Sequence, residues 1–165
     1  MNKLNKMTNS VDKFDNNLFA GMTFPTTANE VKRGNVICIN NRPCKIIEYN
    51  LRKIGRHGNP NAYIAGVDIF TKRRIEKMYV LNTILQIPSM VRREYSIISI
   101  NDNDICCLLD VETKEMNNEI KLPDETEHDI EIAKKIKNFI TEGKPINVFV
   151  LYALNIEKIT DIKEV

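Results

Sequence analysis

Short apolar runs rich in β-branched residues alternate with turn residues in the first half of the chain. Such runs cover residues 36–39, 44–49, 62–70 and 74–80, and residues such as Asn, Gly, Pro and Thr separate them. Runs of this length between turn residues are typical of β-strands joined in hairpins. Four or five short strands in so short a stretch predict a small β-barrel.

The second half begins with the same strand pattern and then changes period. Ile132, Ile136, Phe139 and Ile140 are spaced i, i+4, i+7 and i+8, which places them on one face of a helix. The helix is expected to begin after Asp124 and to end near Gly143. Three strands, a helix and two strands are the order of an OB-fold barrel. The strand-like runs of this half are 95–100, 105–109, 119–122, 146–154 and 156–162.

These patterns divide the chain into a tail and two barrels. Residues 1–21 are polar and rich in Asn, so we interpret them as a flexible tail. Residues 88–93 contain a proline, a serine and two arginines between apolar runs, which is typical of a junction. The expected domains are therefore 22–91 and 92–165. No internal repeat is visible.

The charge is distributed unevenly between these segments. The net charge of the chain is only +2, but residues 22–91 hold eleven Lys or Arg against four acids, whereas residues 92–165 hold ten against sixteen. The balances are +7 and −6, and residues 1–21 add +1. The basic half is expected to bind a polyanion. The alternative interpretation is an unevenly charged, solvated surface.

Composition argues against several other classes of protein. The chain has no signal-peptide pattern and no apolar run long enough to cross a membrane, so a cytoplasmic location is expected. A zinc site is not expected, because the four cysteines have no Cys-x-x-Cys spacing. Only His57 and His128 are present, and no phosphate-binding glycine loop occurs. We therefore expect no enzyme, no cofactor, no metal and no small-molecule substrate. The cysteines, expected to be reduced core residues, are Cys38, Cys44, Cys106 and Cys107.

Residues 51–61 carry the most specific chemistry in the sequence. Strand-like runs flank them, so they are expected to form a long projecting hairpin. Gly55 and Gly58 permit a tight turn around Arg56 and His57. A guanidinium at this tip binds phosphate or a base edge with two hydrogen bonds, and Arg52 and Lys53 add charge behind it. The pattern indicates an RNA-binding loop; the alternative is an ordinary exposed hairpin whose charges maintain solubility.

Three segments carry the most specific motifs of the chain. They are Asn41-Arg-Pro-Cys-Lys-Ile-Ile-Glu48, Lys53-Ile-Gly-Arg-His-Gly58 and Gly66-Val-Asp-Ile-Phe-Thr71. Together these segments closely resemble eukaryotic translation initiation factor 5A, and the similarity extends from about Met22 through Leu122 and Pro123 into the second barrel. The resemblance implies an all-β fold, with an SH3-like barrel followed by an OB-fold barrel that has one helix.

The resemblance also implies a function and partners. Proteins of this family bind the exit site of the ribosome, contacting large-subunit RNA and proteins beside the peptidyl-tRNA. Their hairpin supports elongation, including polyproline synthesis, and termination, without covalent chemistry of its own. On this reading Lys72, Arg73 and Arg74 are either a solvated hairpin end or a further contact with ribosomal RNA or protein.

The sequence departs from the family at the tip of the loop. The family carries a lysine there, which is converted to hypusine by an aminobutyl group from spermidine and then a hydroxyl. This chain has Arg56. The modification needs a neutral primary amine, whereas a guanidinium stays protonated, so Arg56 is predicted to be unmodified. Lys53 is the remaining loop lysine, and its position on an arm argues against modification.

Two other functions remain open. A general single-strand RNA-binding protein could use the OB barrel, but that function needs aromatic platforms in a positive groove, and this half is acidic. A factor with an unmodified tip could instead occupy the ribosome as a structural or storage protein without promoting peptide transfer.

Overall fold

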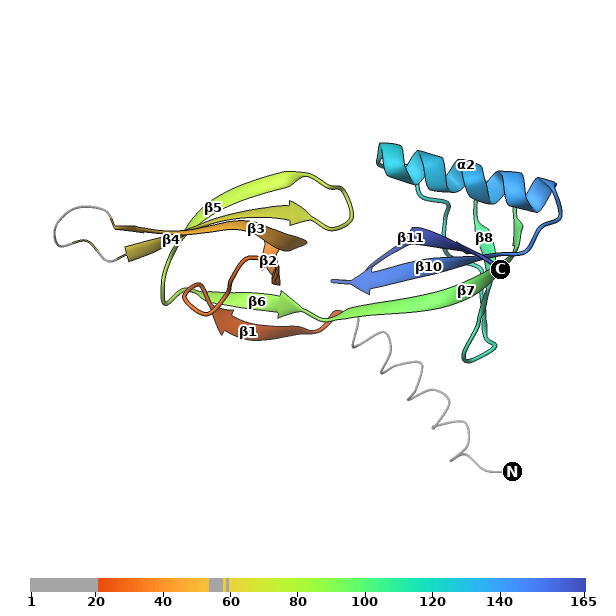
Figure 1. Cartoon of the computed structure of the whole chain (residues 1–165). Helices are drawn as coiled ribbons and strands as arrows, with labels where there is room; N and C mark the ends of the chain where they lie inside the picture. The colour runs from red at the N-terminus through yellow and green to blue at the C-terminus, as the bar shows by residue number, and fades with distance from the viewer. Residues whose placement is uncertain (1–20, 54–57, 59) are drawn as a thin grey trace, which may run out of the picture. The chain divides into compact units, whose positions relative to one another are not determined.

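The computed structural model describes residues 21–53, 58 and 60–165, and they form two compact units. The first unit extends to Met90 and includes Ala153–Asn155, and the second comprises Val91–Tyr152 with Ile156–Val165. Both are built mainly of strands, and the part of the chain that the structure describes contains a single helix with defined bounds (Figure 1). The predicted all-β class is confirmed.

The first unit is an SH3-like half-barrel of six strands. A four-stranded antiparallel sheet has the order β2-β3-β4-β5, and a two-stranded sheet pairs β1 with β6. Ile37, Ile39, Ile46 and Ile64 are almost completely buried between them. The strands are β1 (Thr23–Thr27), β2 (Val36–Ile39), β3 (Arg42–Lys53), β4 (Pro60–Asp68), β5 (Arg74–Val80) and β6 (Ile84–Pro88).

The second unit has the element order and sheet of an OB fold. Its sheet order is β11-β10-β7-β8-β9, and helix α2 packs Ile132 and Ile136 against this barrel (Figure 1). Thr126 and Asp129 cap the helix by reciprocal hydrogen bonds between side chain and backbone. The elements are β7 (Met90–Ile100), β8 (Cys106–Asp110), β9 (Met116–Asn117), α2 (Glu127–Thr141), β10 (Ile146–Ala153) and β11 (Ile156–Glu164).

Several boundaries differ from the sequence-based expectation. Residues 88–93, where the domain boundary is expected, contain the division between the two units at Met90 and Val91 and lie almost wholly in strands: β6 ends at Pro88 and β7 begins at Met90. Ser89 between these strands donates its backbone N–H to the carbonyl of Met22. The strand expected at 119–122 is reduced to a bridge between Ile105 and Lys121, and pairing with β8 comes from β9 instead. The pattern also gave no signal for β1, whose burial does not alternate. Such short strands depend on their partners more than on local composition.

Each barrel contains a turn of the same type, which the spacing of apolar residues did not indicate. In each unit a strand ends in an aspartate, whose carboxylate accepts the backbone N–H groups two and three residues later. A lysine with positive φ follows in both turns, at 62° for Lys72 and 61° for Lys114. The corresponding sequences are Asp68-Ile-Phe-Thr-Lys72 and Asp110-Val-Glu-Thr-Lys114. Local repetition is therefore present at the level of a turn.

Asp68 links its turn to the strand next to it. It is 2% exposed, and its Oδ2 atom accepts a hydrogen bond of 2.6 Å from Arg42 Nε. Gly66, two residues before it, packs so closely that a Cβ atom would lie 3.0 Å from Cys44 Cβ and from Ile39 Cδ1. These contacts explain the residues found in the segment from Gly66 to Thr71, because they stabilise the turn and the packing at this end of the sheet.

Candidate nucleic-acid interface

The β3–β4 hairpin extends the sheet beyond the core of the first unit. Its pairing continues through Tyr49↔Ile64 and Leu51↔Ala62 to Lys53↔Pro60, which confirms the predicted hairpin. Leu51, two residues after Tyr49 on the same face of β3, is 59% exposed, whereas its partner Ala62 on β4 is still fully buried in the core cluster. The β3 arm therefore leaves the core at Leu51. We call this hairpin, from Tyr49 to Ile64, the finger.

The predicted tip residues Gly55, Arg56 and His57 lie outside the described residues. Gly58 is described and is half-buried. The two basic residues on the arm, Arg52 and Lys53, are both exposed at the end of β3. The structure therefore places cationic side chains directly before the tip, as expected for a surface that meets phosphates.

Arg52 is held against an aromatic side chain of the opposite strand. Its guanidinium carbon lies 4.4 Å from the ring centroid of Tyr63, which is a favourable cation–π geometry. Arg52 and Tyr63 meet diagonally, because the direct partner of Arg52 across the hairpin is Asn61. This contact orients the arm's guanidinium at the surface of the finger.

Arg74, on β5, lies near the same tyrosine, but its guanidinium forms ion pairs with two acidic side chains. Its Nη2 atom lies 3.3 Å from Glu48 Oε2 and 2.9 Å from Glu76 Oε1, and it donates to the Tyr63 hydroxyl at 3.5 Å. These partners, Tyr63 first and then Glu76, raise the pKa of Arg74, and Arg74 in turn lowers the pKa of Glu76. The charged side chains of these ion pairs are each about half exposed, so the pairs add little stability. They do offset the charge of Arg74.

The structure divides the second basic group of the sequence. Lys72 and Arg73 lie in the turn between β4 and β5, at the opposite end of the sheet from the β3–β4 connection, and both are exposed (Figure 1). The nine residues of β4 separate the two ends, which corresponds to roughly 30 Å. Arg74, the first residue of β5, instead reaches the Tyr63 hydroxyl of the finger. Lys72 and Arg73 therefore form a surface apart from Arg52 and Lys53, whereas Arg74 contacts the base of the finger.

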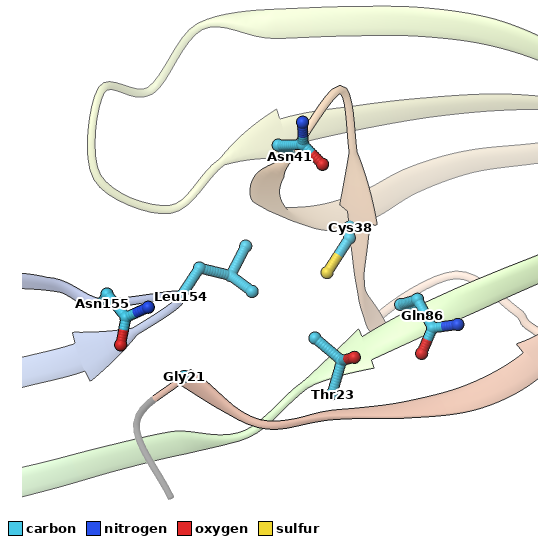
Figure 2. Close-up of a pocket in the computed structure, with 7 residues that line it drawn as sticks. All are labelled: Gly21, Thr23, Cys38, Asn41, Gln86, Leu154 and Asn155. Carbon is cyan, nitrogen blue, oxygen red and sulfur yellow. The ribbon is translucent and has the colours of Figure 1, made fainter. Parts of the chain in front are cut away.

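The remaining features of the described chain offer no competing chemical site. A pocket of the first unit is lined by seven residues, none of them charged (Figure 2). No group of metal-ligating side chains occurs among the described residues, and no helix in that part of the chain is long and apolar enough to cross a membrane. The residues that line the pocket are Gly21, Thr23, Cys38, Asn41, Gln86, Leu154 and Asn155.

The cysteines are structural. All four are free thiols, and Cys44 and Cys106 are fully buried, while Cys38 and Cys107 are partly exposed. Burial raises the pKa of Cys44 to about 11 and that of Cys106 to about 12. These two thiols therefore stay protonated at neutral pH and are poor nucleophiles.

Comparison with known proteins gives the same division into two units. The family model for the N-terminal domain of translation initiation factor 5A-like proteins matches residues 21–81, and the model described as "Eukaryotic elongation factor 5A hypusine, DNA-binding OB fold" matches residues 90–163. The chain belongs to the translation initiation factor 5A family. Its relatives in the family are translation factors, so membership of the factor 5A family gives this chain a role in translation.

Relatives of factor 5A match over nearly the whole chain. Eukaryotic translation initiation factor 5A-1 of Medicago sativa is 30% identical over 162 residues, covering 96% of this chain and 98% of the relative. A factor 5A family protein of Naegleria fowleri has a similar structure, with a TM-score of 0.78 and 36% identity over 86% of this chain and 98% of its own. Factor 5A of Methanococcus jannaschii shares the fold, with a TM-score of 0.61 and 23% identity over 86% of this chain and 95% of its own.

Sequence reasoning missed Tyr63 as part of the factor 5A finger. A tyrosine in a strand-like run is most often a packing residue, so its composition gave no signal. The pairing register of β3 with β4 would have indicated it, because residues two positions apart across a hairpin lie within reach of aromatic side chains.

Proposed function

We propose that this protein is a cytoplasmic ribosome-binding factor that inserts its finger beside the peptidyl-tRNA at the exit site. There it supports elongation, including polyproline synthesis, and termination. The observation that carries the proposal is the paired β3–β4 finger with Arg52 and Lys53 exposed directly before the tip. A cationic projection of this kind meets RNA phosphates, and the ribosome performs the chemistry while the factor positions the tRNA.

Arg56 takes the place of hypusine in this proposal. Its guanidinium is charged at any physiological pH and offers a planar set of donors for a phosphate or a base edge. It is several atoms shorter than hypusine, so we expect its contacts with tRNA or ribosomal RNA to lie less deeply in the ribosome. The factor would act with a permanent charge in place of a modified lysine.

The intact mass of the native protein is predicted to show no hypusine-sized addition. Peptides that contain Lys53 and Arg56 should have unmodified masses, because a guanidinium does not provide the neutral primary amine that the modification needs. Mass spectrometry of protein purified from its natural source checks this. A hypusine-sized addition on Lys53 would contradict it.

The complex with the ribosome tests the function itself. We expect cryo-electron microscopy to show the factor at the exit site with the finger among nucleotides of the large subunit and of the peptidyl-tRNA. The same map also shows whether Lys72 and Arg73, at the other end of the sheet, contact the ribosome, which allows their surface to be compared with the finger. A finger that extends into solvent while the protein is bound to the ribosome would overturn the proposal.

A factor that occupies the ribosome without promoting peptide transfer is the second candidate. The observation in its favour is Arg56, because the family-type modified lysine is absent. Binding to the ribosome is common to both candidates, so only activity separates them.

A further inference from the structure

One face of the finger's base combines a cation, an aromatic ring and exposed apolar side chains. Tyr63 is paired directly with Met78 of β5, and Asn61, two residues before it, is paired with Val80. Because side chains two positions apart share a face of a strand, these residues lie on one side of the sheet together with Arg52. We call Arg52, Tyr63, Met78 and Val80 the outer patch.

The outer patch is left open by the rest of the first unit. Met78 is 40% exposed and Val80 is 47% exposed, and neither belongs to the buried cluster of the unit. On the opposite face of the same strand, Tyr79 is 8% exposed and packs in that cluster. Met78 and Val80 are therefore surface residues and not the exposed margin of the buried core.

The charges around the outer patch favour an anionic partner. Arg52 is exposed at its edge toward the tip, and Lys53 follows at the end of β3 on the other face, whereas the acids Glu48 and Glu76 are bound to Arg74 at the edge away from the tip. The first unit as a whole carries excess positive charge, with eleven Lys or Arg against four acids in residues 22–91. A ligand with a flat apolar face and a negative group fits this arrangement.

We propose that the outer patch is a stacking platform for an unpaired RNA nucleotide. Its base lies against the guanidinium of Arg52 and the apolar side chains of Met78 and Val80, and its phosphate meets Arg52 or Lys53. Unpaired bases in RNA commonly stack on aromatic rings or on arginine planes, and Tyr63 holds the guanidinium plane in place beneath the base. The inference rests on the proposed function, since the finger must reach RNA for the platform to be used.

Fluorescence of a short single-stranded RNA that contains 2-aminopurine tests the platform with the full-length protein. Stacking should quench the fluorophore when the wild-type protein binds. Arg52→Lys keeps the positive charge but removes the planar group, and Tyr63→Ser removes its support. Both variants are expected to lose most of the quenching and to weaken binding about fivefold.

Matched variants separate stacking from charge and from folding. Arg33→Lys makes the same substitution at an exposed arginine that belongs to neither group of predicted RNA-binding residues, and it should behave as the wild type. Tyr63→Phe retains the ring and should stay within about twofold of the wild type, because a phenyl ring still supports the guanidinium. Arg52→Lys changes an exposed side chain, so it tests the platform even if Tyr63→Ser unfolds the unit.

The outcomes distinguish the platform from the wider function. Wild-type protein that fails to quench the RNA probe would overturn the platform, and so would quenching by Arg52→Lys equal to that of the wild type. Cosedimentation of the same proteins with ribosomes gives the second readout. Wild-type protein that sediments with ribosomes but shows no dependence on Arg52 in the probe assay refutes the platform alone. Quenching that depends on Arg52 without ribosome binding supports the platform and refutes the proposed function.

Discussion

Replacing Arg56 by alanine is expected to reduce polyproline synthesis about tenfold in a reconstituted translation system. The substitution removes the charge at the tip of the finger while leaving Arg52 and Lys53 on the arm. Hydrogen bonds to charged groups contribute about 1.5–3 kcal/mol, and about 1.4 kcal/mol corresponds to a factor of ten. The measurement is the rate of synthesis of a polyproline peptide with wild-type and variant factor at equal ribosome occupancy.

Two further variants define what the tip contributes. Arg56→Lys keeps the charge but provides a point charge instead of a planar fork, so unmodified protein of this kind should retain an intermediate rate. Arg33→Ala removes an exposed arginine that belongs to neither group of predicted RNA-binding residues and should leave polyproline synthesis nearly unchanged. Equal rates for the wild type and Arg56→Ala would show that the tip does not promote peptide transfer, and would favour the protein that merely occupies the ribosome.

Replacing Asp68 by alanine is expected to lower the free energy of unfolding of the first unit by about 3 kcal/mol. The carboxylate is buried, and it accepts hydrogen bonds from Phe70 N at 2.8 Å, Thr71 N at 3.1 Å and Arg42 Nε at 2.6 Å. Its removal leaves the cation without this partner and opens the turn, and breaking a buried pair costs about 3–5 kcal/mol. We take the lower end because Arg42 is about one third exposed.

The repeated turn provides the control for this experiment. Asp110→Ala removes the equivalent carboxylate of the second unit, which binds Glu112 N, Thr113 N and Arg93. Hydrogen exchange reports the units separately, through the backbone amides of core residues such as Ile64 and Val148. Asp68→Ala should reduce protection mainly at Ile64, and Asp110→Ala mainly at Val148. Equal loss at both amides in either variant would contradict independent roles for the two turns.

Hydrogen-exchange protection is also expected to fall at acid pH, because the carboxyl groups of Asp68 and Asp110 become protonated there. Burial alone raises the pKa of Asp68, but the hydrogen bonds from Arg42 and from the two backbone amides outweigh it, so its pKa is lowered; the pKa of Asp110 is lowered in the same way. A lowered pKa stabilises the fold above the unfolded value of about 3.9. This stability is lost as the pH falls through the folded pKa. Asp68→Asn should therefore flatten the acid dependence at Ile64.

Local sequence was sufficient to predict those strands and the helix whose apolar residues follow a regular spacing. The run at Arg74–Val80 and the helical spacing of Ile132 and Ile136 gave the observed elements, because alternation and i, i+4 spacing are set by backbone geometry alone. The motif residues around Lys53 and Gly66 indicated the family, which the matches confirm. Local pattern gave no indication that Ser89, between β6 and β7, donates a backbone hydrogen bond to Met22.

What the sequence determined by itself was the succession of elements, the charge of each half and the arginine at position 56. The tertiary structure decided which of these residues share a surface. It placed Arg52 over Tyr63, which is paired with Met78, and it placed Arg73 at the far end of the sheet. The reason is physical: strand register and hairpin direction depend on pairing between distant segments, and no local spacing encodes which side chains the pairing brings together.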